Sequence, residues 1–137
     1  YSTVITQRLR EELLTLDKPV CRSFDEDKWE REIRRLYTTA AGNVLDLQRK
    51  AGWYELDWQS LYADKWAEIK ELFAGMPSSG SLEHLLNTVG LSMEEFIREY
   101  GEGKIRDAAV YAKDLKNRYT VLWPYWSLIG EDGRFFI

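Results

Sequence analysis

The sequence predicts a single all-α domain, a compact bundle of six or seven helices. Apolar residues recur at three- and four-residue spacing through most of the chain, which is the pattern of helices with one buried face. Residues typical of helix ends separate these stretches. Of the 137 residues, 45% are hydrophobic and 31% are charged, as in an ordinary globular protein. We therefore expect one helical domain spanning residues 1–137.

Capping residues and helix breakers set the boundaries of the first six predicted helices. The predicted N-terminal caps are, in chain order, Ser23 or Asp25, Asp57, Ser81 and Ser92, the last in a capping box with Glu95. Asp17-Lys18-Pro19 ends the first helix, a break falls near Thr39, and Gly52 closes the third helix. The predicted helices cover residues 2–16, 25–39, 40–50, 57–73, 81–89 and 92–100. In the helix over 57–73 we expect Trp66 near the edge and these side chains inward: Trp58, Leu61, Tyr62, Ile69, Leu72 and Phe73.

The longest predicted element is a central helix from Lys104 to Trp123, which Pro124 ends because proline lacks a backbone N–H. Its predicted buried face includes three small alanines, which would let another helix approach closely. That face comprises Ile105, Ala108, Ala109, Ala112, Leu115, Tyr119 and Leu122. The opposite, polar face comprises Arg106, Asp107, Lys113, Asp114, Asn117 and Arg118.

Charge and composition argue against several classes of function. The net charge of −4 gives no general attraction to nucleic acid or to anionic membranes. Residues 81–100 resemble a helix-turn-helix, but the second helix presents Glu94, Glu95 and Glu99 against a single Arg98.

No apolar run approaches the length of a membrane span and no signal peptide is evident, so we expect a cytoplasmic protein with neither nucleic acid nor membrane as partner. Because the chain begins at Tyr1 inside a helical pattern, we expect a piece of a longer protein.

The sequence contains no complete active site. His84 is the only histidine, and no cluster has the ligand spacing of a metal site. Cys21 stands alone, which rules out an internal disulfide. With no histidine nearby in sequence, its thiol lacks the base that would activate it as a nucleophile. We therefore predict no catalytic, cofactor-binding or metal-binding residue in this chain.

The stretch from Ala112 to Leu122 reads AKDLKNRYTVL. It resembles the C-terminal signature of the sn-glycerol-1-phosphate dehydrogenases, relatives of the iron-containing alcohol dehydrogenases, which is roughly A-x-D-[IL]-R-x-R-[YF]-T-[VI]-L. Lys116 departs from the pattern, because the family tends to have arginine there. The opening, from Tyr1 to Thr6, is similar to the segment that follows a metal-binding His-Gly pair in the same family.

The resemblance implies an activity for a longer parent protein. Enzymes of this family reduce dihydroxyacetone phosphate to sn-glycerol-1-phosphate with NADH or NADPH, and a divalent metal (zinc, nickel or iron) polarises the substrate carbonyl. The metal ligands and the nucleotide-binding domain would precede residue 1. The resemblance implies that this chain pairs with that upstream domain as scaffold and cleft wall and is inactive alone. A homo-oligomer is left open.

Three residues of the motif are candidates for contact with substrate or for lining the cleft: Arg118, Lys116 and Thr120. For Arg118, one role is structural, because a cation in the last turn of a helix complements the helix dipole. The other role is to grip a phosphate with its fork of donors. We favour the structural role, because arginines near helix C-termini are common.

Two alternatives come from other classes. One is a stand-alone helical interaction domain that uses some of its six tryptophans and eight tyrosines on a partner surface. The other, less favoured, is a helix-turn-helix DNA-binding regulator.

Overall fold

The computed structural model describes residues 1–135, and every regular element in that range is helical. The predicted fold class, an all-α bundle, is confirmed. The α-helices are α1 (Ser2–Leu14), α2 (Glu26–Tyr37), α3 (Ala41–Ala51), α4 (Trp58–Ala74), α5 (Ser79–Thr88), α6 (Met93–Tyr100), α7 (Glu102–Tyr111) and α8 (Leu122–Leu128). Short 3-10 turns cover Thr38–Ala40, Trp53–Glu55, Ala112–Leu115 and Gly130–Asp132.

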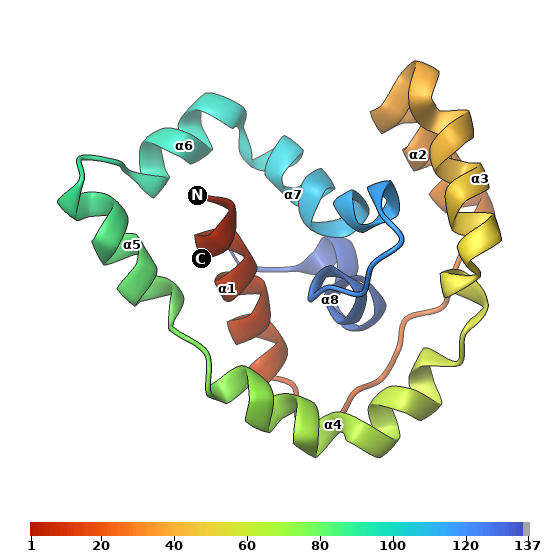
Figure 1. Cartoon of the computed structure of the whole chain (residues 1–137), viewed down its shortest axis with the longest axis horizontal. Helices are drawn as coiled ribbons and strands as arrows, with labels where there is room; N and C mark the ends of the chain where they lie inside the picture. Colours follow the sequence, from red (N-terminus) through yellow and green to blue (C-terminus); the bar gives the residue numbers. More distant parts are fainter. Residues whose placement is uncertain (136–137) are drawn as a thin grey trace.

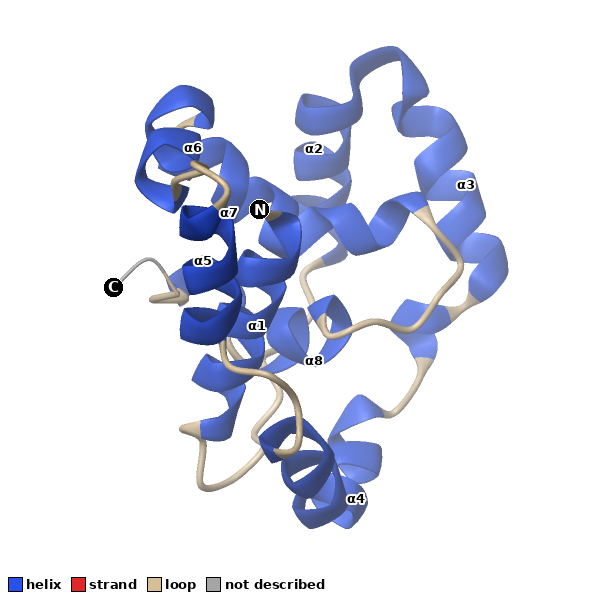
Figure 2. Cartoon of the chain, turned by 60° about the vertical axis from the view of Figure 1, so that its left-hand side comes forward, coloured by secondary structure: helices blue, strands red, loops and turns tan. Residues whose placement is uncertain are grey.

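Helices α1 and α8 occupy the centre of the molecule (Figure 1). Helix α1 packs against α4, α5 and α8, and α7 packs against α6 and α8. Helices α2 and α3 form an antiparallel pair on one side, which Figure 2 shows beside the rest of the bundle. None of the described helices is both long and apolar enough to cross a membrane.

The core consists of two apolar clusters that meet at a pair of aromatic side chains. The larger cluster surrounds α1 and includes Leu9, Leu13 and Tyr62, all almost fully buried. The smaller cluster lies between α2, α3 and α7. Tyr54 and Trp126 pack against both clusters. Lys113 contacts both of these side chains.

Most of the predicted helix ends are confirmed. The side chains of Asp25, Asp57 and Ser92 each accept a hydrogen bond from a backbone N–H three residues later, as N-terminal caps do. Gly52 follows α3 with φ +72°, a left-handed conformation that a side chain would disfavour. The predicted break near Thr39 is the 3-10 turn over Thr38–Ala40.

Two details in the middle of the chain differ from the prediction. Leu61 and Leu72 are 46% and 69% exposed, whereas Trp66 is buried at 6%. The reason is geometric: the stripe of α4 that faces α1 passes through Tyr62, Trp66, Ile69 and Phe73, and the two leucines lie beside it. Helix α5 begins one turn earlier than predicted, because Ser78 rather than Ser81 provides the cap.

The predicted central helix from Lys104 to Trp123 is wrong. Helix α7 ends at Tyr111, a 3-10 turn carries the chain to Leu115, and α8 begins only at Leu122. Pro124 lies in the first turn of α8, where a missing N–H costs nothing, so it does not end a helix there. Leu115 and Tyr119, predicted to be buried, are 45% and 48% exposed. Lys113 and Asp114, predicted to be on the polar face, are buried instead.

Candidate functional site

The three candidate residues lie together on one exposed loop. We call residues Lys116–Thr120, between the 3-10 turn and α8, the motif loop. The side chains of Lys116, Arg118 and Thr120 are all exposed there. Because α7 ends at Tyr111, Arg118 is not in the last turn of a helix, and the dipole role that we favoured for it is wrong.

Side chains of α3, α4, α8 and the turn before α4 contact the interior side of the motif loop. The Gln48 amide donates to the carbonyl oxygens of Asp114 (2.8 Å) and Lys116 (3.3 Å). The Trp123 indole N–H donates to the carbonyl oxygen of Arg118 at 3.1 Å.

Two further side chains of the loop are anchored to aromatic residues. Asn117 accepts a hydrogen bond from the Trp53 indole, and the hydroxyls of Tyr119 and Tyr62 lie 3.1 Å apart. The Tyr119 ring stacks on Trp58, with ring centroids 5.7 Å apart. The loop therefore has anchors along its length while its two cations stay at the surface.

Directly before the loop, Lys113 and Asp114 form a fully buried ion pair. The Lys113 Nζ lies 3.0 Å from Asp114 Oδ2, and neither side chain is exposed to solvent. Lys113 also donates to the Tyr54 hydroxyl (2.8 Å) and to the Val110 carbonyl oxygen (2.9 Å). Tyr54 in turn donates to Asp114 Oδ1. Every donor and acceptor contact of this pair thus lies inside the protein, as a buried charge requires.

Four aromatic rings surround the Lys113 ammonium group. Its distances to the ring centroids of Trp126, Trp123, Tyr54 and Tyr111 are 4.8, 5.1, 5.2 and 5.7 Å. Such rings attract a cation electrostatically but do not replace its hydration. Burial therefore lowers the pKa of Lys113 from 10.5 to about 8, although Asp114 opposes this change. Burial, together with the charge of Asp114, raises the pKa of Tyr54 well above its ordinary value.

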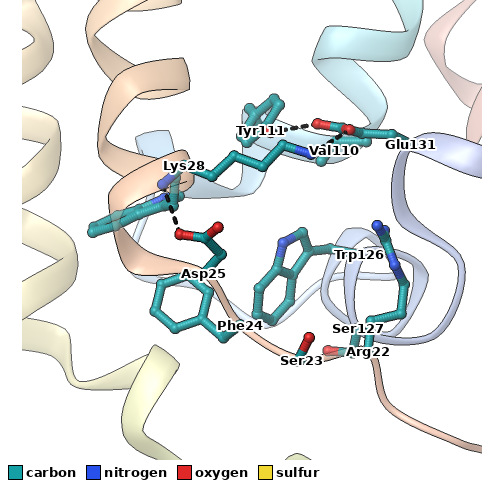
Figure 3. Close-up of a pocket in the computed structure, with 11 residues that line it drawn as sticks. Arg22, Ser23, Phe24, Asp25, Lys28, Val110, Tyr111, Trp126, Ser127 and Glu131 are labelled. Atoms are coloured by element: carbon teal, nitrogen blue, oxygen red, sulfur yellow. Dashed lines mark hydrogen bonds and ion pairs between the residues drawn. The ribbon is translucent and has the colours of Figure 1, made fainter.

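Two of these rings also line a small pocket (Figure 3). Its volume is about 70 Å³, and Tyr111 and Trp126 line it together with Phe24 and Lys28. Glu131 accepts hydrogen bonds from Lys28 and from the Tyr111 hydroxyl, each at 2.8 Å. This volume holds a few water molecules and is well below the roughly 300 Å³ at which ligand pockets begin. Lys113 does not line this pocket, and its side chain is fully buried.

An apolar groove runs along α1, α6 and α7 and reaches the start of α8. Its volume is about 280 Å³. It is lined mostly by apolar side chains, among them Ile5, Leu9, Phe96, Tyr100, Ala108 and Leu122. All three alanines singled out in the sequence, Ala108, Ala109 and Ala112, line it. Leu122 follows the motif loop by two residues, so the groove and the loop adjoin.

The remaining residues weighed in the sequence stay outside any site. His84 is exposed on α5, and Cys21 is half-buried. Within residues 1–135, no three or more His, Cys, Asp and Glu side chains are arranged to hold a metal ion. The exposed side of α6 carries Glu94, Glu95 and Glu99.

Sequence reasoning missed the buried pair, although one signal was available. Lys113 lies eight residues after Ile105 and four after Ala109, so helical spacing puts it on the buried face. We assigned it to the polar face from its charge alone. Lys113 binds Tyr54 and Asp114 binds Gln48, partners that are about 60 residues away along the chain, and no sequence pattern connects them.

Comparison of the chain with protein-family models, with curated proteins and with solved structures finds no match.

Proposed function

We propose that this chain is the C-terminal helical domain of a metal- and NAD(P)-dependent dehydrogenase similar to the sn-glycerol-1-phosphate dehydrogenases. The observation that carries the proposal is the AKDLKNRYTVL motif over residues 112–122. In the structure this motif has two parts. Asp114 and Tyr119 make interior contacts, whereas Lys116, Arg118 and Thr120 face solvent. A motif that is half scaffold and half exposed polar surface suits one wall of a substrate cleft.

The exposed part of the motif has the chemistry to bind a phosphate group. Arg118 offers a planar fork of donors and Lys116 a second cation, and Thr120 adds a hydroxyl. A phosphorylated triose such as dihydroxyacetone phosphate carries the matching negative charge. In this proposal the chain binds and orients the phosphate end of the substrate.

The metal and the nicotinamide cofactor are assigned to the upstream nucleotide-binding domain. The donor set of this chain does not fit a metal: His84 is exposed, and no suitable cluster of ligands exists within residues 1–135. In this proposal no residue of the chain takes part in hydride transfer. We propose that the apolar groove packs against the upstream domain, because Ser2, at the start of α1, lines it.

The test uses the parent protein encoded by the full reading frame. We expect a His-Gly pair a few residues upstream of Tyr1 and a glycine-rich nucleotide-binding region further back. We expect Arg118→Ala and Arg118→Lys to raise the KM for dihydroxyacetone phosphate at least tenfold, because lysine lacks the bidentate fork. The Tm should stay unchanged, because the side chain is exposed.

Arg31→Ala is the matched control, since Arg31 is also exposed but lies on α2, in the helix pair outside the groove and the motif loop. Turnover by residues 1–137 alone would contradict the proposal. An unchanged KM in both Arg118 variants would remove the motif loop from the substrate site.

The second candidate is a stand-alone helical interaction domain, and the apolar groove favours it. Ala108 and Ala112 are one turn apart, and small side chains allow a partner helix to approach closely. The partner would be an amphipathic helix with apolar residues at three- and four-residue spacing. The full reading frame separates the two candidates, because only the dehydrogenase requires the upstream nucleotide-binding region.

A further inference from the structure

The contacts of Lys113 and the anchors of the motif loop share the same side chains. Trp123 packs on the Lys113 ammonium group with its ring and donates its indole N–H to the carbonyl oxygen of Arg118. Gln48 binds the carbonyl oxygens of both Asp114 and Lys116. The interior pair and the exposed loop are therefore two ends of one hydrogen-bonded unit.

The buried pair lies in the 3-10 turn that follows α7. The turn over Ala112–Leu115 contains both Lys113 and Asp114, and both side chains are fully buried. The chain then leaves Lys116 in an extended conformation, with φ −137° and ψ 149°.

We propose that Lys113 is a positioning residue, an internal cation that holds the motif loop in the conformation that presents Lys116 and Arg118. The ammonium group binds the Asp114 carboxylate, the Tyr54 hydroxyl and the Val110 carbonyl oxygen. These three groups must stay together for the motif loop to keep its conformation. The four rings around it form a cage of the kind that binds ammonium ligands, and here its occupant is the protein's own side chain. Only the consequence for substrate binding rests on the proposed function.

The first test is hydrogen exchange on the charge-neutral double variant Lys113→Met/Asp114→Asn, which keeps the side-chain volumes and leaves no unpaired charge. We expect the amides of Lys116, Leu122 and Trp123, which are hydrogen-bonded to Lys113 and Thr120 at the two ends of the loop, to exchange at least tenfold faster than in the wild type, because the loop loses its internal cation. The amides of α1, which report the stability of the whole core, should stay within threefold. Lys50→Met, an exposed lysine on α3, should change neither.

The second test is chemical rescue of Lys113→Ala. This substitution removes three side-chain carbons and the ammonium group, and propylammonium has the same three carbons and charge. 1-Propanol is a neutral molecule of similar size. We expect propylammonium, at matched ionic strength, to restore loop protection at least fivefold more than 1-propanol does. The cage recognises the charge of the ligand as well as its volume.

Several results would overturn the inference. Loop exchange within twofold of the wild type in the double variant would show that the pair does not hold the loop. Equal acceleration in α1 and the loop would show a general effect on stability. Equal recovery with 1-propanol, or recovery with neither molecule, would show that the ammonium group is not what the cage requires.

In the full enzyme, the double variant should raise the KM for the phosphorylated substrate. An unchanged KM beside a loosened loop would count against the proposed function only.

Discussion

Removing one partner of the Lys113–Asp114 pair should destabilise the protein far more than replacing both. In Lys113→Met, the Asp114 carboxylate stays buried, and the hydrogen bond from the Tyr54 hydroxyl is left to compensate its charge. In Asp114→Asn, the ammonium group stays in its aromatic cage without a counter-charge. In the double variant, two neutral side chains of similar volume fill the same space.

The structure sets the scale of these effects. Burial lowers the pKa of Lys113 from 10.5 to about 8 even with Asp114 beside it. At about 1.36 kcal/mol per pKa unit, the charged form is about 3 kcal/mol less favourable in the folded protein than in water. An uncompensated buried charge typically costs about 3–5 kcal/mol, whereas a neutral pair of similar volume is often close to neutral in its effect. We therefore expect each single variant to lose about 3–5 kcal/mol and the double variant no more than about 1 kcal/mol.

Urea unfolding of the four proteins at neutral pH measures this as a double-mutant cycle. The expected coupling energy between the two sites is at least about 2 kcal/mol. The matched control is the Lys28–Glu131 pair, which has a similar distance of 2.8 Å but side-chain exposures of 46% and 42%. Its coupling, measured with Lys28→Met and Glu131→Gln, should stay below about 1 kcal/mol.

Additive effects at Lys113 and Asp114, within about 0.5 kcal/mol, would refute the reasoning. In that case the two side chains would each act on their own. The aromatic cage and Tyr54 would then account for the burial of each group separately.

Three further predictions follow from the same structure. The folded protein releases the Lys113 proton at about pH 8, whereas the unfolded chain releases it only near 10.5. Between these values the unfolded state binds more protons, so the free energy of unfolding should rise with pH from about 8, by up to about 1.4 kcal/mol per pH unit. The rise should flatten above about pH 9, the ordinary pKa of a cysteine thiol, because burial raises the pKa of Cys21 and the opposite slope of that thiol then offsets the slope of Lys113. Lys113→Met should lack the rise, and a flat or falling wild-type profile between about pH 7.5 and 9 would contradict the assignment. Gly130→Ala should lower stability by about 1–3 kcal/mol, because Gly130 has φ +65° and a Cβ there would overlap the Arg22 guanidinium. Gly42→Ala should raise stability by about 0.4–1 kcal/mol, because Gly42 lies on α3 with open space around it. Thermal melts that rank the two variants in the opposite order would contradict this prediction. A fluorescence titration with duplex DNA at physiological salt should show no sequence-selective binding below the micromolar range, because the exposed face of α6 is acidic.

The sequence by itself determined the fold class and most of the helix ends. These features depend on local interactions, so short patterns suffice to predict them. Asp25, Asp57 and Ser92 cap helices because each can accept a hydrogen bond from an N–H three residues later in the chain. Gly52 ends α3 because glycine adopts the left-handed conformation without steric cost.

The tertiary structure decided the region around the motif. Periodicity over residues 104–123 favours a continuous helix, and no local signal interrupts it before Pro124. The interruption comes from Lys113 and Asp114, whose partners Tyr54 and Gln48 belong to a distant part of the chain. The two opposite charges are buried together in that aromatic site within a 3-10 turn, and the exposed motif loop comes after this turn in the chain. A buried ion pair is stable only when all its partners converge in space, and spacing along one chain segment carries no information about that convergence.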